Sequence, residues 1–148
     1  MIAVHVRHGD FINGGIQYPT EAYAHVLRRL VEITGATTIF VGSDDDRVYK
    51  DLPAFMYGDY KTTGPNLTFA HIPREIAGVL YDASNPERSD LLLSQQGKLG
   101  LALSAQMLLF SMSQSFLGTR VSQQGLMGQQ RATYACEDDS CCEHTRIC

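Results

Sequence analysis

Short apolar segments alternate with amphipathic ones along the first half of the chain. Residues 2–6 are apolar apart from one histidine and predict a buried strand. From Pro19 onward apolar residues recur at helical spacing, and Gly35 ends the pattern, which predicts a helix. The members of this stripe are Tyr23, Val26, Leu27, Leu30 and Val31. Residues 37–41 are rich in β-branched side chains and predict a second strand.

The alternation continues in the second half. We expect a short helix that ends near Leu52, a loop over residues 53–65 and a third strand at residues 67–70. Residues 82–98 begin as another loop. A long helix then runs from about Gln96 to Met112, and its apolar stripe has one polar member, Gln106.

A fourth strand is predicted at residues 115–119, followed by a last helix beyond Gln124. Strands that alternate with helices favour an α/β fold with a parallel sheet. The chain has 148 residues, of which 44% are hydrophobic, enough to bury one core. We therefore expect one domain over residues 1–132 and an irregular, Cys-rich acidic tail over residues 133–148.

All four cysteines lie in that tail, so none can link the core to itself. They are Cys136, Cys141, Cys142 and Cys148. Disulfides in an oxidising compartment, a zinc site that uses His144, and an unstructured tail are the three interpretations, and the cysteine spacing is not a standard zinc spacing.

Charge and hydropathy exclude two classes of partner. The formal net charge is -4, and the acidic tail accounts for most of it, so residues 1–135 are nearly neutral. A nearly neutral domain does not predict nonspecific nucleic-acid binding. The sequence contains no run of about 18 apolar residues, so it predicts no membrane-spanning segment.

The candidate chemistry lies where the predicted strands end. The first strand runs into Arg7, His8, Gly9 and Asp10, and the second into the turn 42–46. In open parallel sheets, ligands bind outside the carboxyl ends of the strands, and helix amino termini there favour phosphate. The sequence therefore predicts an anion site at this edge.

Read alone, the Arg7-His8-Gly9 turn resembles the start of histidine phosphatases, in which the histidine becomes phosphorylated. That chemistry requires a second catalytic histidine and further arginines around one phosphate. His25 falls on the first helix, and His71 lacks the expected acidic neighbour. The phosphatase remains an alternative function.

Three motifs in order give a different resemblance. They are His5 to Asp10, Ile39 to Asp45, and Ala105 to Ser111 followed by Phe116 to Gln123. Together, over roughly residues 2–130, they resemble the donor-binding domain of GDP-fucose-dependent fucosyltransferases, most closely the α-1,6 type. The resemblance implies a three-layer, Rossmann-like α/β domain, the donor-binding half of a GT-B glycosyltransferase.

The resemblance also implies roles for individual residues. Arg7 would pair with the β-phosphate of GDP-fucose and neutralise the departing diphosphate, a role that suits its planar guanidinium. Asp10 or Asp45 would orient that cation, and Gly9 would let the backbone approach the phosphate. The remaining donor contacts would come from His5, His8, Asp44, Gln106, Thr119, Ser122 and Gln123.

Ordinary structural roles stand beside these functional ones. Arg7 could form a surface ion pair, Asp10 could form a turn, and Ser122 could cap a helix. His5 points away from the side of Val4 and could be a core histidine. The Asp44-Asp45-Asp46 run suits a helix cap better than a manganese site, so we expect no metal and no cofactor besides the donor substrate.

This chain departs from the family pattern at several positions. His8 replaces a second basic residue, and Gln106 stands where an aspartate recognises guanine, which predicts relaxed nucleotide preference. Phe11 and Gly15 stand where the family has a lysine and a glutamate near the acceptor, and Glu21 is a distant substitute.

The expected function is therefore transfer of fucose from GDP-fucose to a glycan hydroxyl, by a single displacement that inverts the anomeric centre. The family has a preceding acceptor-binding domain and a membrane anchor, which this chain lacks, so we expect a fragment or a donor domain that binds without catalysing. The resemblance implies the Golgi lumen as the location of the whole protein.

Overall fold

The computed structural model describes residues 1–8, 18–59, 66–73, 88–118 and 146–147. They form a five-stranded, wholly parallel sheet in the order β3-β2-β1-β4-β5. The strands are β1 (Ile2–Val6), β2 (Thr38–Ser43), β3 (Thr68–Ala70), β4 (Ser115–Gly118) and β5 (Arg146–Ile147). The described helices are α1 (Thr20–Thr34), α2 (Asp46–Asp59) and α4 (Arg88–Ser111).

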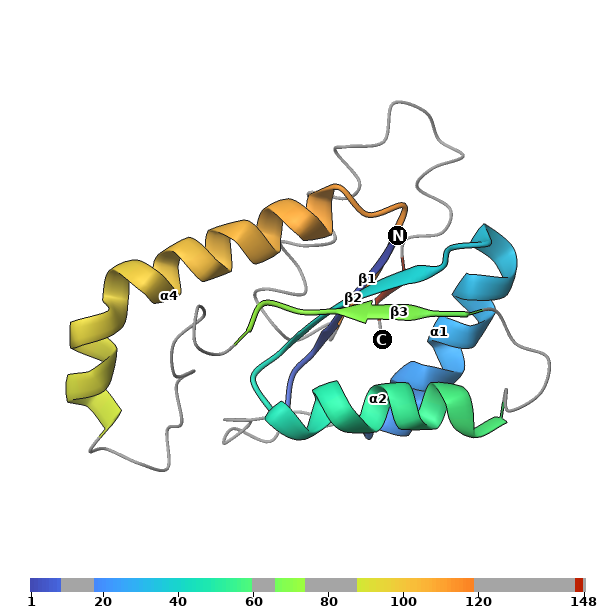
Figure 1. The fold of residues 1–148 in the computed structure, drawn as a ribbon, viewed down its shortest axis with the longest axis horizontal. Coiled ribbons are helices and arrows are strands. Elements are labelled where there is room, and N and C mark those ends of the chain that lie inside the picture. The colour runs from blue at the N-terminus through green and yellow to red at the C-terminus, as the bar shows by residue number, and fades with distance from the viewer. Residues whose placement is uncertain (9–17, 60–65, 74–87, 119–145, 148) are drawn as a thin grey trace.

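Helices cover both faces of the sheet, with α1 and α2 on one side and α4 on the other (Figure 1). The alternation of side chains along β1 explains this arrangement. Ile2, Val4 and Val6 pack into the cluster that contains the apolar stripes of α1 and α2. Ala3 packs with Phe110 of α4 in a second cluster. The structure confirms the predicted α/β fold with a parallel sheet.

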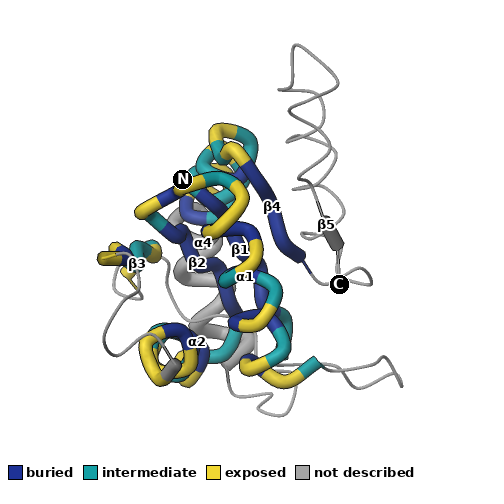
Figure 2. The backbone as a smooth tube through the Cα atoms, turned by 90° about the vertical axis from the view of Figure 1, so that its right-hand side faces the viewer, coloured by how far each residue is buried: buried dark blue, intermediate teal, exposed yellow. Residues whose placement is uncertain are grey.

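Burial follows these layers (Figure 2). Every residue of β1 and β4 is buried, as expected for central strands of a parallel sheet that is covered on both faces. Exposed positions lie along the outer sides of α1 and α2 and also on α4 and in the segments between elements. The core therefore runs along both faces of the central strands.

The predicted apolar stripe of α1 and its predicted end at Gly35 are both confirmed. Tyr23, Leu27, Leu30 and Val31 are buried. Gly35 has φ 65°, a left-handed conformation that glycine adopts without steric cost, and its N–H donates to the carbonyl of Val31 at 2.8 Å.

Helix α2 is longer than predicted. The expected end near Leu52 and the loop from Pro53 are wrong, because the helix continues through Pro53 to Asp59. Val48, Leu52 and Met56 recur every four residues and are all fully buried. Their packing outweighs the backbone hydrogen bond that the proline removes.

Other boundaries also shift. Helix α4 begins at Arg88, about eight residues before its predicted start, in a stretch without glycine or proline up to Gln96. Strand β2 extends two residues beyond its predicted end, to Ser43. The expected irregular tail contains the short strand β5, which pairs with β4.

Several predictions lie outside the described residues. They concern Gly9, Asp10, Phe11, Gly15, Thr119, Ser122, Gln123, the last helix, the domain boundary at residue 132, the four cysteines and His144. Within the part of the chain that the structure describes, no helix is long and apolar enough to cross a membrane.

Candidate functional site

The register of the sheet brings the predicted turns together at one edge. His5 lies opposite Gly42 on β2 and Gly118 on β4, and Val6 lies opposite Ser43. The residues that follow these positions therefore leave the sheet side by side, at the carboxyl ends of β1 and β2. This is the edge at which parallel sheets bind ligands.

Arg7 and Asp44 form an ion pair across this edge. Nε of Arg7 lies 3.3 Å from Oδ2 of Asp44. The other carboxylate oxygen of Asp44, Oδ1, accepts the backbone N–H of His8 at 2.8 Å. A single carboxylate thus joins the end of β2 to the first two residues after β1.

The ring of His8 lies between α1 and α2. Nε2 is 2.9 Å from the carbonyl oxygen of Tyr18, and Nδ1 is 3.4 Å from Oδ2 of Asp45. A carbonyl oxygen only accepts, so Nε2 carries a proton and donates. With a carboxylate oxygen near Nδ1, both ring nitrogens face oxygen atoms of the protein.

Asp45 caps α2. Its Oδ1 accepts the backbone N–H of Arg47 at 3.0 Å, the contact expected of an N-cap aspartate. The Arg47 side chain also binds both oxygens, with Nη2 2.8 Å from Oδ2. This hydrogen bonding lowers the pKa of Asp45, partial burial opposes the shift, and the charges of Arg47 and His8 contribute to the lowering. The predicted capping role of the Asp44-Asp46 run is confirmed at Asp45.

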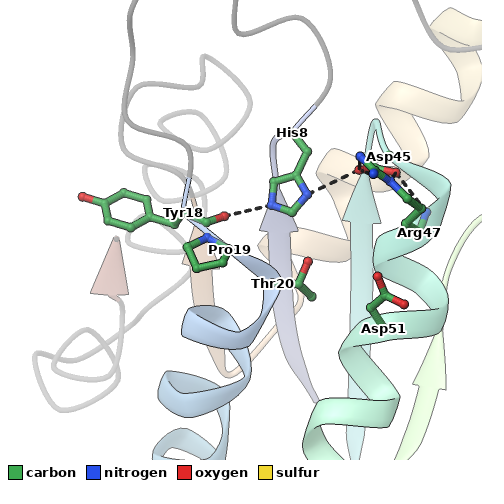
Figure 3. Close-up of a pocket in the computed structure, with 7 residues that line it drawn as sticks. All are labelled: His8, Tyr18, Pro19, Thr20, Asp45, Arg47 and Asp51. Atoms are coloured by element: carbon green, nitrogen blue, oxygen red, sulfur yellow. Dashed lines mark hydrogen bonds and ion pairs between the residues drawn. The ribbon is translucent and has the colours of Figure 1, made fainter.

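A pocket of about 340 Å³ opens beside this cluster (Figure 3). His8 lies in its centre between Tyr18 and Asp45, with Arg47 at the start of α2 beyond Asp45. The other described lining residues are Pro19, Thr20 and Asp51. The amino termini of α1 and α2 both border the pocket, whereas neither Arg7 nor Asp44 is among its lining residues.

Tyr49 holds the turn between β2 and α2. Its hydroxyl donates to the carbonyl of Ser43 at 2.8 Å and accepts the Ser43 N–H at 3.1 Å. Its ring stacks on His71, with centroids 4.4 Å apart. Tyr18, Arg47 and Tyr49 were not predicted as site residues from the sequence. The signal for Arg47 was its place in the first turn after a capping aspartate, whereas the contacts of the two tyrosines depend on tertiary packing.

Two predicted site residues, His5 and Gln106, lie on the α4 side of the sheet. His5 is buried, and its ring makes an edge contact with Phe110, with centroids 6.0 Å apart. The Gln106 amide packs over Gly42, the residue opposite His5 in the sheet. The expected orientation of His5, away from Val4, is confirmed, and it has the surroundings of a core histidine.

A second, larger pocket of about 910 Å³ lies on this same side. It is mostly apolar and is lined in part by Phe40, Ala70, Ile72, Ala102, Ala105 and Leu109. The small side chains of Ala102 and Ala105, on one side of α4, leave it open. This pocket was not predicted from the sequence.

The described site thus brings Arg7, His8, Asp44 and Asp45 together and places His5 and Gln106 on the α4 side. The described residues include no group of three or more His, Cys, Asp or Glu side chains arranged to hold a metal ion. The arrangement offers a guanidinium, an imidazole and two helix amino termini, which are groups that bind anions.

Comparison with known proteins identifies the fold. No protein-family model matches the sequence, and no curated protein matches it either. Among solved structures, POFUT1 in complex with GDP-fucose is similar over 99% of this chain and 40% of its own chain, with a TM-score of 0.57 and 11% identity. POFUT1 in complex with GDP gives the same TM-score and identity, with 42% of its chain covered. The chain therefore has an α/β fold like that of part of POFUT1 and spans less than half of the length of that chain.

Proposed function

We propose that this chain is the donor-binding part of a GDP-fucose-dependent glycosyltransferase of the α-1,6-fucosyltransferase type. The observation that carries the proposal is the Arg7–Asp44 pair at the carboxyl ends of β1 and β2. It occurs in a chain that folds like POFUT1, whose structures hold GDP-fucose and GDP. The resemblance of the sequence motifs supports the same assignment independently of the fold.

In this proposal Arg7 binds the β-phosphate of the donor. Its side chain is 29% exposed, so a ligand at the edge of the sheet can reach the guanidinium. As the bond to fucose breaks, negative charge grows on the departing GDP, and a fixed guanidinium stabilises that charge more than it stabilises the ground state. The acceptor hydroxyl attacks the anomeric carbon from the side opposite to GDP, and its proton passes to water. Because the attack comes from that side, the anomeric centre is inverted.

The remaining parts of the reaction belong to the proposal as well. The acceptor is a glycan hydroxyl, bound by a further domain, since POFUT1 is more than twice as long as the region that this chain matches. The expected location of the whole protein is the Golgi lumen. Asp10, which follows β1 in the sequence, stays the second catalytic candidate that the resemblance gives. Thr119, Ser122 and Gln123, which follow β4 in the sequence, are the candidates that meet the diphosphate.

Calorimetric titration with GDP tests the binding step. We expect saturable binding that weakens at least about tenfold in Arg7→Ala, because a charge-assisted contact to phosphate is lost. Arg29→Ala is the matched control, since Arg29 pairs with Glu32 on the exposed side of α1. Absence of GDP binding up to millimolar concentration, or equal weakening in both variants, would contradict the proposal.

A donor domain that binds without catalysing is the second candidate. It is favoured by Phe11 and Gly15, which stand where the resembled family has a lysine and a glutamate near the acceptor. Release of fucose from GDP-fucose separates the two candidates. Turnover that Arg7→Ala abolishes supports the transferase, whereas binding of GDP-fucose without any turnover supports the binding domain.

The phosphatase alternative fits the structure less well. To become phosphorylated, a histidine must attack phosphorus with a ring nitrogen. In His8, one ring nitrogen faces the carbonyl oxygen of Tyr18 and the other faces the carboxylate of Asp45. A phosphoester substrate in the same assay tests it directly. Hydrolysis of p-nitrophenyl phosphate that His8→Ala abolishes would favour the phosphatase over both transferase-derived candidates.

A further inference from the structure

We propose that Asp44 is the positioning residue for Arg7: its carboxylate fixes the guanidinium in the orientation that meets the β-phosphate. The inference rests on the proposed function, since it concerns the same anion. It assigns the orienting role to Asp44, whereas the sequence motifs pointed to Asp10 or Asp45 for that role and to Asp44 for substrate contact.

Burial is the first argument. The Asp44 side chain is only 6% exposed. A carboxylate so far from solvent must be compensated by hydrogen bonds and opposite charge. It receives both from the segment that follows β1, 36 residues away in the sequence: the backbone N–H of His8 on Oδ1 and the guanidinium of Arg7 on Oδ2. The Asp44 carboxylate is thus held by contacts within the protein and is poorly placed to contact the substrate itself.

The atom used by Arg7 is the second argument. The ion pair joins Oδ2 to Nε, at the stem of the guanidinium. A contact at Nε fixes the plane of the group, while its outer Nη edge is directed away from the stem and suits a bidentate contact with phosphate.

Arg47 provides the contrast. Its Nε and Nη2 both bind Asp45, so that carboxylate covers one whole side of the guanidinium. Arg47 thereby serves the cap of α2, whereas the Arg7 contact with Asp44 joins the end of β2 to the residue that follows β1.

Two effects of Asp44 on anion binding oppose each other. Its charge repels a nearby diphosphate, but its contact removes the conformational freedom that Arg7 would otherwise lose on binding. Ordering one long side chain accounts for about a 3- to 10-fold change in affinity. The repulsion is largely offset in the folded protein, because Arg7 and the His8 N–H already neutralise the carboxylate. We therefore expect the orienting effect of Asp44 on Arg7 to outweigh its repulsion of the diphosphate.

Asp44→Asn tests the contact between Asp44 and Arg7 most directly. The amide oxygen can still accept the His8 N–H, but the amide nitrogen then faces Arg7 Nε, donor against donor. Asp46→Asn is the control for charge, because it removes a negative charge two residues away and keeps the Asp44 carboxylate. If Asp44→Asn fails to fold, Arg7→Lys keeps the positive charge and lacks both Nε and the planar fork.

Affinities for GDP and GMP give the readout, because GMP has no β-phosphate. We expect Asp44→Asn to weaken GDP binding about 3- to 10-fold and to leave GMP within about twofold. Asp46→Asn should leave the GDP to GMP ratio unchanged, and Asp44→Asn should add nothing to Arg7→Ala. An unchanged ratio or tighter GDP binding in Asp44→Asn would overturn the inference and leave the proposed function standing.

A second measurement is independent of nucleotide. The NMR resonance of the Arg7 Nε–H should be sharp and slow to exchange in the native chain and should broaden in Asp44→Asn. If native protein binds no GDP, the proposed function fails. If the resonance is the same in both proteins, Asp44 does not position Arg7, whatever the nucleotide does.

Discussion

The side chain of Gln106 occupies the space that any side chain at Gly42 would need. A Cβ atom at residue 42 would lie 2.6 Å from Nε2 and 2.8 Å from Cδ of Gln106. It would also lie 2.9 Å from Cζ of Phe110, which is fully buried. Glycine at this position therefore lets α4 pack directly on β2, beside His5.

We expect Gly42→Ala to lower the free energy of unfolding by about 1 to 3 kcal/mol, because α4 or its side chains must move to admit the methyl group. Urea denaturation measures the change. Gly100→Ala is the matched control on α4, where an added Cβ meets nothing within 4 Å, and it should stabilise the protein by about 0.5 to 1 kcal/mol. Equal destabilisation by the two variants would show that the contact with Gln106 is not the cause.

Local patterns were sufficient to predict four of the strands and the parallel α/β fold, but neither the strand order nor β5. β1, α1 and β4 match their predictions because each has a clear apolar period and a clear end, such as Gly35 after α1. The end of α2 could not be predicted the same way. Pro53 is a strong local signal against helix, and the burial of Leu52 and Met56 that outweighs it exists only after folding.

Tyr49→Phe should destabilise the turn after β2 by about 1 to 3 kcal/mol, because it leaves the buried N–H and carbonyl of Ser43 without the tyrosine hydroxyl. Tyr57→Phe is the control. Its hydroxyl bonds to a single carbonyl, that of Leu67, from an exposed ring, so the loss should be about 1 kcal/mol or less. Thermal unfolding of both variants checks the order, and a larger loss in Tyr57→Phe would refute it.

Four residues of the candidate site were predictable from the sequence, whereas their pairing was not. Strand ends indicated Arg7, His8, Asp44 and Asp45 because turns after adjacent parallel strands share one edge. Which aspartate meets which cation depends on where α2 begins. The helix starts at Asp46, so Asp45 becomes the cap, and Asp44 is left to pair with Arg7.

Phe110→Ala should cost about 3 to 5 kcal/mol, because Phe110 is fully buried and its ring contacts those of His5, Phe40 and Phe116. Leu108→Ala is the control on the same helix, since Leu108 is 56% exposed and its loss should stay within about 0.5 kcal/mol. Chemical denaturation gives both values. Similar losses at the two positions would mean that α4 is not held by the aromatic cluster.

The stability contributed by Asp45 should depend on pH. Arg47 holds the pKa of the folded carboxyl below its ordinary value of 3.8, so the ionised form stabilises the fold at neutral pH. That contribution is complete above the unfolded pKa and is lost as pH falls through the folded pKa. Asp45→Asn keeps a side chain that caps α2 and removes the charge, so native protein should exceed it in stability at pH 6, and the gap should close as pH falls below about 4.

Asp45→Ala separates the cap from the charge. It should lie about 0.5 to 2 kcal/mol below Asp45→Asn at every pH, because only the cap distinguishes the two variants. Urea titrations of the three proteins between pH 2.5 and 6 measure both differences. Arg47→Ala should raise the pKa of Asp45, which NMR titration of the carboxyl reports, since Arg47 is the largest cause of its lowering. A native-to-Asn gap that is constant with pH would show that the Arg47–Asp45 contact adds no stability through charge.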